Sequence, residues 1–594
     1  MFKISIFLLI IIFFVIHVEV DCLSIFISNI SLLSIPFVLF LLISGIFLSC
    51  SKWNLNISVQ SAVILLFCLA ILGEFWLFFK EFKFVLLLVF SIWIYLLISI
   101  LPKISSCHII CALLSGALTE VVFGYLQLFK VIENGNPFFY ITGSMGNPAP
   151  FASYIATCIP FAFYASLKTE GENRIMGYLG LTVLILSVAI LPQTQSRSAI
   201  VATTIGVLFM LDQKYHWYHQ VRNYLKSKGL LTIVMIVSPI VLGKLLHWLY
   251  LVKLDSAQGR FLVWKGALSL IRDNFWTGVG YGNFSKSYAA YQANYFGSGK
   301  GTPREKFLAD YVTTAYNDIL ELTAETGIIG CGLFVYFLWL SVKRIRTVVV
   351  SKEEEGLRQA TLASLLIMGI LSLTTYPLSV FPIQMNLFFL LGYYNSIGSN
   401  EVKSGTIVLG SWVTKPFAIG LLGFAGWLGY YQYKNYRALV VLREGAILVS
   451  QYRPKEAIAK YESVYPVFWH DGDYLFKYAY ILAQQKEYVY SNQLLSQAKD
   501  ITGSYNAYTL LGENHYKMKQ YGEAEENLLY SCNLIPSKFY CKHLLLKVYM
   551  ESGQYKKAKI LQNEMMKMPV KVPSLAVNEM ISNTRLIGKL LQSL

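Results

Sequence analysis

The sequence predicts an all-α protein, in which a polytopic membrane bundle of about 12–13 transmembrane helices precedes a soluble α-solenoid. Three observations lead to this fold class. The chain is 55% hydrophobic and 14% charged, whereas soluble domains carry about 25% charged residues. Residues 1–430 contain a succession of apolar runs that are long enough to span a bilayer. Residues 437–594 are polar and repetitive, which indicates a separate helical-repeat domain.

The predicted membrane domain consists of apolar segments in which charged residues are rare. We expect these segments near 4–18, 33–50, 57–78, 84–101, 107–129, 150–167, 176–192, 198–212, 229–249, 318–340, 359–376, 380–396 and 407–430. The first segment follows Lys3, as the apolar core of a signal peptide does. Its end, HVEVDC, has no small-residue cleavage site, so we expect it to be a retained helix.

Lysine and arginine are distributed unevenly among the loops between these segments. With the N-terminus in the cytoplasm, one set of loops carries most of the basic residues. The opposite short loops carry only Lys80, Lys83, Lys130 and Arg197. Because cytoplasmic loops are rich in basic residues, this orientation is predicted, and an odd number of spans places the tail outside. The same loops explain the net charge of +16 without nucleic-acid binding.

Several polar, proline-containing links fall on the predicted outer face. They are the turn GSMGNPAP (143–150), the link PQTQSRS (192–198), the long segment 250–317 and the link TYPLSVFP (375–382). The orientation was derived without these motifs, so their convergence on one face predicts a functional site there. In the first turn, Asn147 either caps the helix that begins at the prolines or faces a ligand.

Arg197 lies between two apolar segments and is flanked by Ser196 and Ser198. Arginine has a planar guanidinium group whose N–H donors can bind two phosphate oxygens at once, and the serines add hydroxyl donors. The alternative is a charge that only positions a helix end at the membrane surface. Both interpretations stay open on the sequence alone.

The long outer segment contains QGRFLVWKGALSLIRDNFWTGVGYGNF (258–284), which has a helical period followed by a glycine-rich turn. Arg260, Trp264 and Lys265 bring cations and an aromatic ring close to the membrane surface. They predict either a site for an anionic substrate or an interfacial helix with snorkelling bases.

The stretch TTAYNDILELTAETGIIG (313–330) carries three carboxylates toward the bilayer. Asp318, Glu321 and Glu325 are spaced to share one helical face. With Thr314 as a plausible N-cap, Asp318 is explained as an acid in the first turn of a helix. Glu325 lies about two turns deeper, where a carboxylate needs a partner, and the cations of the outer links are candidates.

The tail repeats at steps of 34, 33 and 34 residues. The small residues that recur are Ala457, Ser491, Ala524 and Ala558. This period and the spacing of aromatic and small residues resemble tetratricopeptide repeats, in which small residues let paired helices approach closely. Cys532 and Cys541 could form a disulfide in an extracytoplasmic tail, although spacing alone does not determine this. The cysteines of the chain have no metal-site spacing, so no metal site is predicted.

The motifs GNPAPFASYIA, SRSA, GRFLVWKGALSLIRDNFWTGVGYGNF, YNDILELTAETGIIG and TYPL occur together in one order. In this order they resemble the O-antigen ligase superfamily over about 140–395. The resemblance implies a GT-C type glycosyltransferase that is inverting and independent of metals and cofactors. Such an enzyme takes a glycan from undecaprenyl diphosphate on the periplasmic face of the bacterial inner membrane. Its acceptor is lipid A-core, a growing glycan or a protein.

The resemblance also suggests roles for residues. Arg197 and Arg260 would hold the diphosphate, with Ser196, Ser198 and Lys265 as further donor-binding candidates. Asn147, Asn317 and Trp264 are candidates for acceptor binding or for structural roles.

The general base is the point at which this sequence departs from the family. Many ligases have histidine immediately before the asparagine of the fourth motif, where this chain has Tyr316. Tyrosine, with a pKa of about 10, is a poor base at neutral pH. Either Glu325, Glu321 or Asp318 takes the role, or Tyr316 only orients the acceptor, or catalysis has been lost.

Three alternatives therefore accompany the ligase hypothesis. A repeat-unit polymerase would use the same donor with a growing glycan as acceptor. A catalytically silent scaffold would recruit glycan-assembly proteins through the repeat tail. A transporter is disfavoured, because polar residues gather at one surface and the membrane part has no internal repeat. The tail mildly favours a protein or another large acceptor, since a solenoid offers a concave surface.

Overall fold

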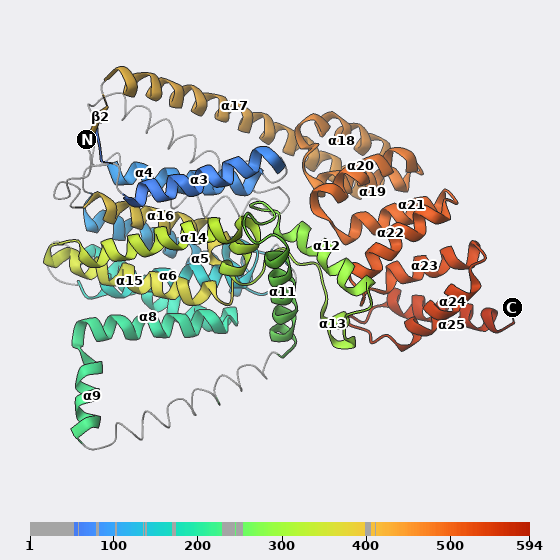
Figure 1. The fold of residues 1–594 in the computed structure, drawn as a ribbon, viewed down its shortest axis with the longest axis horizontal. Helices are drawn as coiled ribbons and strands as arrows, with labels where there is room; N and C mark the ends of the chain where they lie inside the picture. Colours follow the sequence, from blue (N-terminus) through green and yellow to red (C-terminus); the bar gives the residue numbers. More distant parts are fainter. Residues whose placement is uncertain are drawn as a thin grey trace. The chain divides into compact units, whose positions relative to one another are not determined.

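The computed structural model describes residues 53–56, 59–78, 82–100, 104–134, 136, 139–168, 174–227, 244, 254–397, 406–409 and 411–593. The segments predicted at 4–18 and 33–50 lie outside these residues, as does the segment 229–249 apart from residue 244. The chain forms two compact units, one of Met1–Leu246 with Tyr316–Tyr436, and one of His247–Ala315 with Arg437–Leu594. Figure 1 gives the helix labels used below.

The first unit is a bundle of helices (Figure 1), most of which are apolar. Its described helices are α3 (Val59–Phe78), α4 (Phe82–Ile100), α5 (Ser106–Leu128), α6 (Pro148–Ser166), α7 (Arg174–Ile190), α8 (Arg197–Tyr215), α9 (Trp217–Ser227), α14 (Asp318–Thr347), α15 (Lys352–Ser372), α16 (Phe381–Ser396) and α17 (Ser411–Ser450), of which α17 continues into the second unit. All except α9 coincide with a predicted apolar segment. Three described helices are long and apolar enough to cross a membrane, at Ser106–Leu128, Arg174–Thr194 and Asp318–Thr347. The chain is therefore a multi-pass membrane protein with an all-α bundle.

Helix α6 lies at the centre of one half of the bundle and packs against α5, α7, α8 and α15. Its side chains from Pro150 to Ala162 are buried without exception. The close approach of α7 to α6 depends on small residues. A Cβ added at Gly180 of α7 would lie 2.5 Å from the Cβ of Ala165, so the two backbones meet where neither residue has a large side chain.

A two-stranded ribbon is a departure from the all-helical prediction for this unit. Strand β1 (Trp53–Asn56) pairs antiparallel with β2 (Thr406–Leu409). Strand β2 contains Thr406, Ile407 and Val408, and β-branched residues favour the extended backbone. The segment predicted as helical from 407 therefore begins as a strand, and α17 starts at Ser411.

Helix α14 is broken, where the sequence predicted one continuous span over 318–340. Gly327 has φ 64° and ψ −174°, which is not helical, so the helix divides into 318–326 and 328–347. Only glycine adopts this backbone conformation without strain. The break follows Glu325 by two residues.

The second unit combines the segment 254–315 with the tail. The segment forms α11 (Leu254–Asp273), α12 (Phe284–Gly297) and α13 (Pro303–Leu308). The tail forms α18 (Pro454–Phe468), α19 (Gly472–Gln484), α20 (Tyr488–Thr502), α21 (Tyr505–Lys517), α22 (Tyr521–Leu534), α23 (Phe539–Glu551), α24 (Tyr555–Lys567) and α25 (Leu575–Ser593). The sequence suggested that the segment belongs to the membrane domain, whereas in the structure it packs with the tail.

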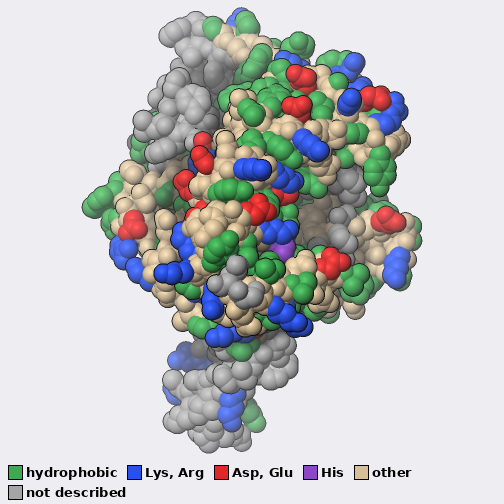
Figure 2. All heavy atoms as spheres, turned by 90° about the vertical axis from the view of Figure 1, so that its right-hand side faces the viewer, with side chains coloured by type: hydrophobic (Ala, Val, Ile, Leu, Met, Phe, Trp, Pro, Cys, Tyr) green, Lys and Arg blue, Asp and Glu red, His purple; other side chains and the backbone are tan. Residues whose placement is uncertain are grey.

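Consecutive tail helices pack against one another, as in a helical repeat domain. The recurring small residues Ala457, Ser491, Ala524 and Ala558 each lie in the first turn of α18, α20, α22 and α24 and are fully buried. At the α21–α22 contact, a Cβ added to Gly512 would lie 2.5 Å from Leu528. Cys532 and Cys541 are buried free thiols in this structure. On the face seen in Figure 2, acidic and basic side chains are interspersed with hydrophobic ones.

Candidate active site at one end of the bundle

Three short links of the first unit lie at one end of the bundle. They are the 3₁₀ turns η2 (Gly143–Met145), η4 (Leu191–Thr194) and η5 (Pro377–Ser379), and all three contact α6. They belong to the motifs 143–150, 192–198 and 375–382. The start of α14 contacts η5, so the carboxylate-bearing stretch reaches the same end. The structure thus brings together the motifs of this unit from which the sequence predicted a site.

Two buried polar residues of α5 hold the η2 turn. The carboxylate of Glu120, 1% exposed, accepts hydrogen bonds from the hydroxyl and the backbone amide of Ser144. Gln127 accepts from the amides of Thr142 and Gly143 at 2.9 and 3.0 Å, and it donates to the Gly143 carbonyl at 2.9 Å. Sequence reasoning missed both residues. For Glu120 the sequence held a signal, because an acid inside the apolar run 107–129 requires a partner.

Asn147 is the N-cap of α6. Its side-chain oxygen accepts from the Ala149 amide at 2.9 Å, and Pro148 occupies the first helical position. Proline at this position needs no amide partner. The geometry favours the capping interpretation over a ligand contact for Asn147.

Arg197 is the first residue of α8 and is half-buried, as are Ser196 and Ser198. The chain enters the helix through Gln195 in the left-handed conformation, with φ 54°. Ser196 occupies the N-cap position, but its side chain makes no capping hydrogen bond. A helix N-terminus has a partial positive charge, which disfavours a cation and attracts an anion. The structure thus places Arg197 beside the amides of a helix N-terminus, and its role there stays a prediction.

Asn317 is the N-cap of α14, in place of the expected Thr314. Its side-chain oxygen accepts from the Leu320 amide at 3.0 Å, and its amide group donates to the Leu373 carbonyl at 3.2 Å. Thr314 lies outside the helix, because the chain between the two residues is irregular. Asn317 therefore joins the start of α14 to the end of α15.

Asp318 is 3% exposed and also joins chain segments. One carboxylate oxygen accepts from the Ser372 hydroxyl at 2.8 Å and from the Leu378 amide at 3.0 Å. The sequence explained Asp318 by the helix dipole alone. The structure adds that this carboxylate holds α14, α15 and η5 together.

Tyr316 has an unusual backbone conformation, with φ 53°. Its half-buried ring meets the ring of Tyr376 edge-on, at 5.8 Å between centroids. A left-handed conformation is uncommon for a residue with a side chain and is concentrated at functional sites and tight turns. Tyr316 is thus held in a defined orientation at the end of the bundle where the links meet.

Glu321 and Glu325 differ in accessibility. Glu321 is half-buried one turn into α14, whereas Glu325 is 6% exposed and lies just before the break at Gly327. Glu321 is thus the most accessible of the three carboxylates on this helix.

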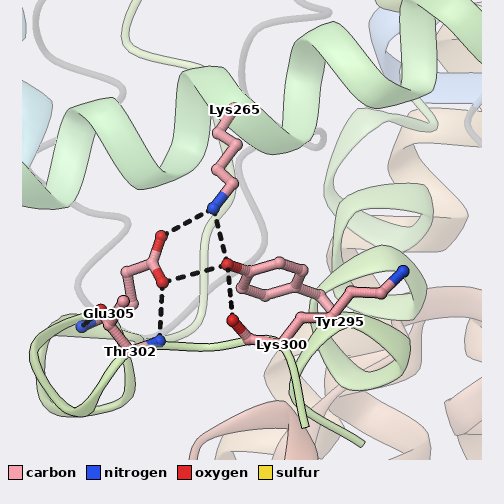
Figure 3. Close-up of polar contacts among 5 residues, drawn as sticks. All are labelled: Lys265, Tyr295, Lys300, Thr302 and Glu305. Carbon is pink, nitrogen blue, oxygen red and sulfur yellow. Dashed lines mark hydrogen bonds and ion pairs between the residues drawn. The ribbon is translucent and has the colours of Figure 1, made fainter. Parts of the chain in front are cut away.

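In the second unit, Lys265 is part of a polar cluster that joins α11, α12 and α13 (Figure 3). Its ammonium group donates to Glu305 at 2.9 Å and to the Tyr295 hydroxyl at 2.6 Å. These bonds raise the pKa of Lys265. Partial burial opposes ionisation of Glu305, but hydrogen bonds from the Thr302 amide, Lys265 and Tyr295 outweigh it and lower the pKa of Glu305 to about 2. The cluster gives Lys265 a structural partner.

The other two candidates of this unit also lie on α11. The Trp264 indole donates to the carbonyl of Ala315 at 3.0 Å, which ties α11 to the end of the segment. Arg260 is half-buried. Among the residues that the structure describes, no group of three or more His, Cys, Asp or Glu side chains could hold a metal ion.

Apolar helices with arginine- and carboxylate-bearing links at one end define a multi-pass membrane protein with a candidate site at that end. Residues 182–335 match a protein-family model described as O-antigen ligase. The match includes Arg197, Arg260 and the start of α14, and it confirms the resemblance to the O-antigen ligase superfamily. It supports a membrane glycosyltransferase of the ligase or polymerase type.

A comparison with curated proteins finds no match. The family match ends at residue 335, so the tetratricopeptide class of the tail stays a prediction.

Proposed function

We propose that the protein transfers a glycan from an undecaprenyl-diphosphate-linked donor to an acceptor on the periplasmic face of the bacterial inner membrane. The transfer inverts the anomeric configuration and uses neither a metal nor another cofactor. The observation that carries this proposal is Arg197 at the first position of α8, at the end of the bundle where the links and the start of α14 meet. The family match over 182–335 supports it.

The donor explains the cation at the start of α8. A diphosphate leaving group carries negative charge that grows as its bond to the sugar breaks. The amides of a helix N-terminus and a bidentate guanidinium stabilise that charge without reorganisation. Arg260 is the second arginine assigned to the diphosphate. Lys265 is engaged with Glu305, so we assign it to the stability of α11 and α13.

The acceptor hydroxyl must lose a proton during transfer. Its oxygen attacks the anomeric carbon opposite the diphosphate, the bond from that carbon to the diphosphate oxygen breaks, and the proton passes to a base. We assign the base to Glu321, because it is the most accessible of the three carboxylates of α14, whereas Asp318 is buried at the junction of α14, α15 and η5. Glu325, which is more deeply buried, is the alternative base, and Tyr316 orients the acceptor.

A catalytically silent scaffold is the second candidate function. The observation that favours it is Tyr316 in the position where many ligases have histidine. The two functions differ in whether the purified protein forms a product.

The test is transfer by the full-length protein in lipid nanodiscs. The donor is an undecaprenyl-diphosphate glycan, and lipid A-core, a repeat-unit glycan and a serine-rich protein are offered as separate acceptors. We expect a glycosylated product with one of them, and its identity separates ligase, polymerase and oligosaccharyltransferase. Absence of product with a donor and acceptor taken from the native cell envelope would favour the scaffold.

A further inference from the structure

Helix α12, from the segment between two membrane spans, forms part of the hydrophobic core of the tail. Ala289 and Ala293 are each 3% exposed and belong to the same buried cluster as Ala524, Leu528 and Cys532 of α22. The small side chains let α12 lie directly on α22, and Figure 1 shows the two helices side by side. The tail therefore uses part of its helical surface to bind a segment of its own chain.

Buried polar contacts fix the register of this docking. Gln292 of α12 is 2% exposed, and its amide group donates to the carbonyl of Leu534 at 2.7 Å and to that of Asp310 at 3.0 Å. Farther along the segment, Asp310 forms an ion pair with Lys571 of the tail at 3.2 Å. A buried amide that has two carbonyl acceptors is costly to separate from them.

The opposite side of α12 supports α11. A Cβ added at Gly266 of α11 would lie 2.4 Å from the ring of Tyr288, so the two helices touch there. The bonds of Lys265 to Tyr295 and Glu305 form a second contact. Continuous packing thus runs from α22 through α12 to α11, which carries Arg260.

We propose that the repeat tail is a clamp that positions the Arg260-bearing helix through α12, and is not a free arm for recruiting partners. The role of Arg260 in this proposal rests on the proposed function, but the docking itself does not. The tail and the loop then act as one part of the transfer machinery. Loosening α12 from α22 is then expected to lower transfer.

A cysteine pair tests the docking in the full-length protein. A Cβ added at Gly297 would lie 3.9 Å from the Cβ of Asn533, within the range of about 3.5–4.5 Å for a disulfide. Gly297→Cys with Asn533→Cys is expected to cross-link under mild oxidation. Ala290→Cys with Asn533→Cys is the control, because Ala290 is exposed on the same helix. Peptide mapping separates this bond from one to the native Cys532, and no 297–533 bond would overturn the docking.

A second pair of variants tests the positioning. Ala293→Arg places a large charged side chain in the shared core, and Ala290→Arg makes the same change on the exposed side. We expect Ala293→Arg to raise amide hydrogen exchange in α12 by roughly tenfold or more, since an unpaired charge in a core is strongly destabilising. We also expect it to reduce transfer, whereas Ala290→Arg leaves both unchanged. Faster exchange with unaltered transfer would overturn the positioning role.

A disulfide tether between α12 and α22 distinguishes a loss of positioning from a general loss of folding. In Gln292→Ala, which weakens the docking more gently, the 297–533 disulfide should restore transfer when oxidised and lose it when reduced. Failure of the formed disulfide to restore transfer would overturn the proposal. If the wild type transfers no glycan at all, the proposed function fails, and the cross-linking and exchange measurements still decide the docking.

Discussion

The carboxylate of Asp318, at the first residue of α14, accepts a 2.8 Å hydrogen bond from the hydroxyl of Ser372, at the last residue of α15. The same oxygen accepts from the Leu378 amide in η5. One buried side chain thus connects three segments at the end of the bundle where the candidate site lies.

We expect Asp318→Ala to destabilise the first unit by about 2–4 kcal/mol, because two buried donors lose their acceptor. Asp318→Asn keeps a side-chain oxygen that can accept one of these bonds, so a smaller loss is expected. Thermal unfolding in detergent measures both variants. A double-mutant cycle with Ser372→Ala should give a coupling of about 1 kcal/mol, and additive effects would contradict the pairing.

Gly143→Ala should destabilise the first unit more than Gly146→Ala does. Both glycines have positive φ, so both substitutions cost backbone strain. A Cβ at Gly143 would also lie 2.2 Å from the Phe151 ring and 2.5 Å from Glu120, whereas at Gly146 it meets nothing within 4 Å. We expect an additional loss of about 1–3 kcal/mol at Gly143 from overpacking. Equal unfolding temperatures for the two variants would contradict the packing of η2 on Glu120.

The Lys265–Glu305 cluster should make the second unit sensitive to acid. The pKa of Glu305 falls from 4.5 to about 2 on folding. A depressed carboxyl pKa contributes stability above the unfolded value, and that contribution is lost as the pH falls through the folded value. The difference in unfolding temperature between wild type and Glu305→Gln should therefore be complete above about pH 4.5 and shrink toward pH 2. A difference that does not change over this range would contradict the cluster.

The two candidate bases should respond differently to neutralisation. We expect Glu321→Gln to lower the turnover rate by about 10²–10⁴-fold with little change in stability, since this is the usual contribution of a general base. Glu325→Gln, at the buried position, should mainly change the unfolding temperature. The pH–rate profile of each variant checks the assignment, because loss of the base removes the acid limb of the profile. The reverse pattern would assign the base to Glu325.

Much of the fold could be predicted from the sequence, because apolar length and turn chemistry are local properties. The segment 176–192 became α7 at Arg174–Ile190, and Asn147 became the cap that the turn 143–150 indicated. The break at Gly327 could not be recognised, since a single glycine in an apolar run is equally compatible with a continuous helix.

Long-range packing was the other feature that the sequence did not predict. Gln292 bonds to a carbonyl 242 residues away, and Lys265 pairs with a carboxylate 40 residues away. Neither pairing has a signal in local periodicity. The grouping of the loop with the tail was missed for this reason, as was the structural use of Lys265.

The central claim is that Arg197 and Arg260 hold the diphosphate of a lipid-linked glycan donor. The most direct measurement is the transfer rate of the full-length protein with both arginines replaced, as Arg197→Ala with Arg260→Ala. We expect a loss of at least about 10²-fold, because the leaving-group charge is no longer stabilised. Arg197→Lys should retain more activity than Arg197→Ala, because lysine keeps the positive charge but lacks the bidentate guanidinium group. Turnover at the wild-type rate in the double variant, with the fold intact, would contradict the claim.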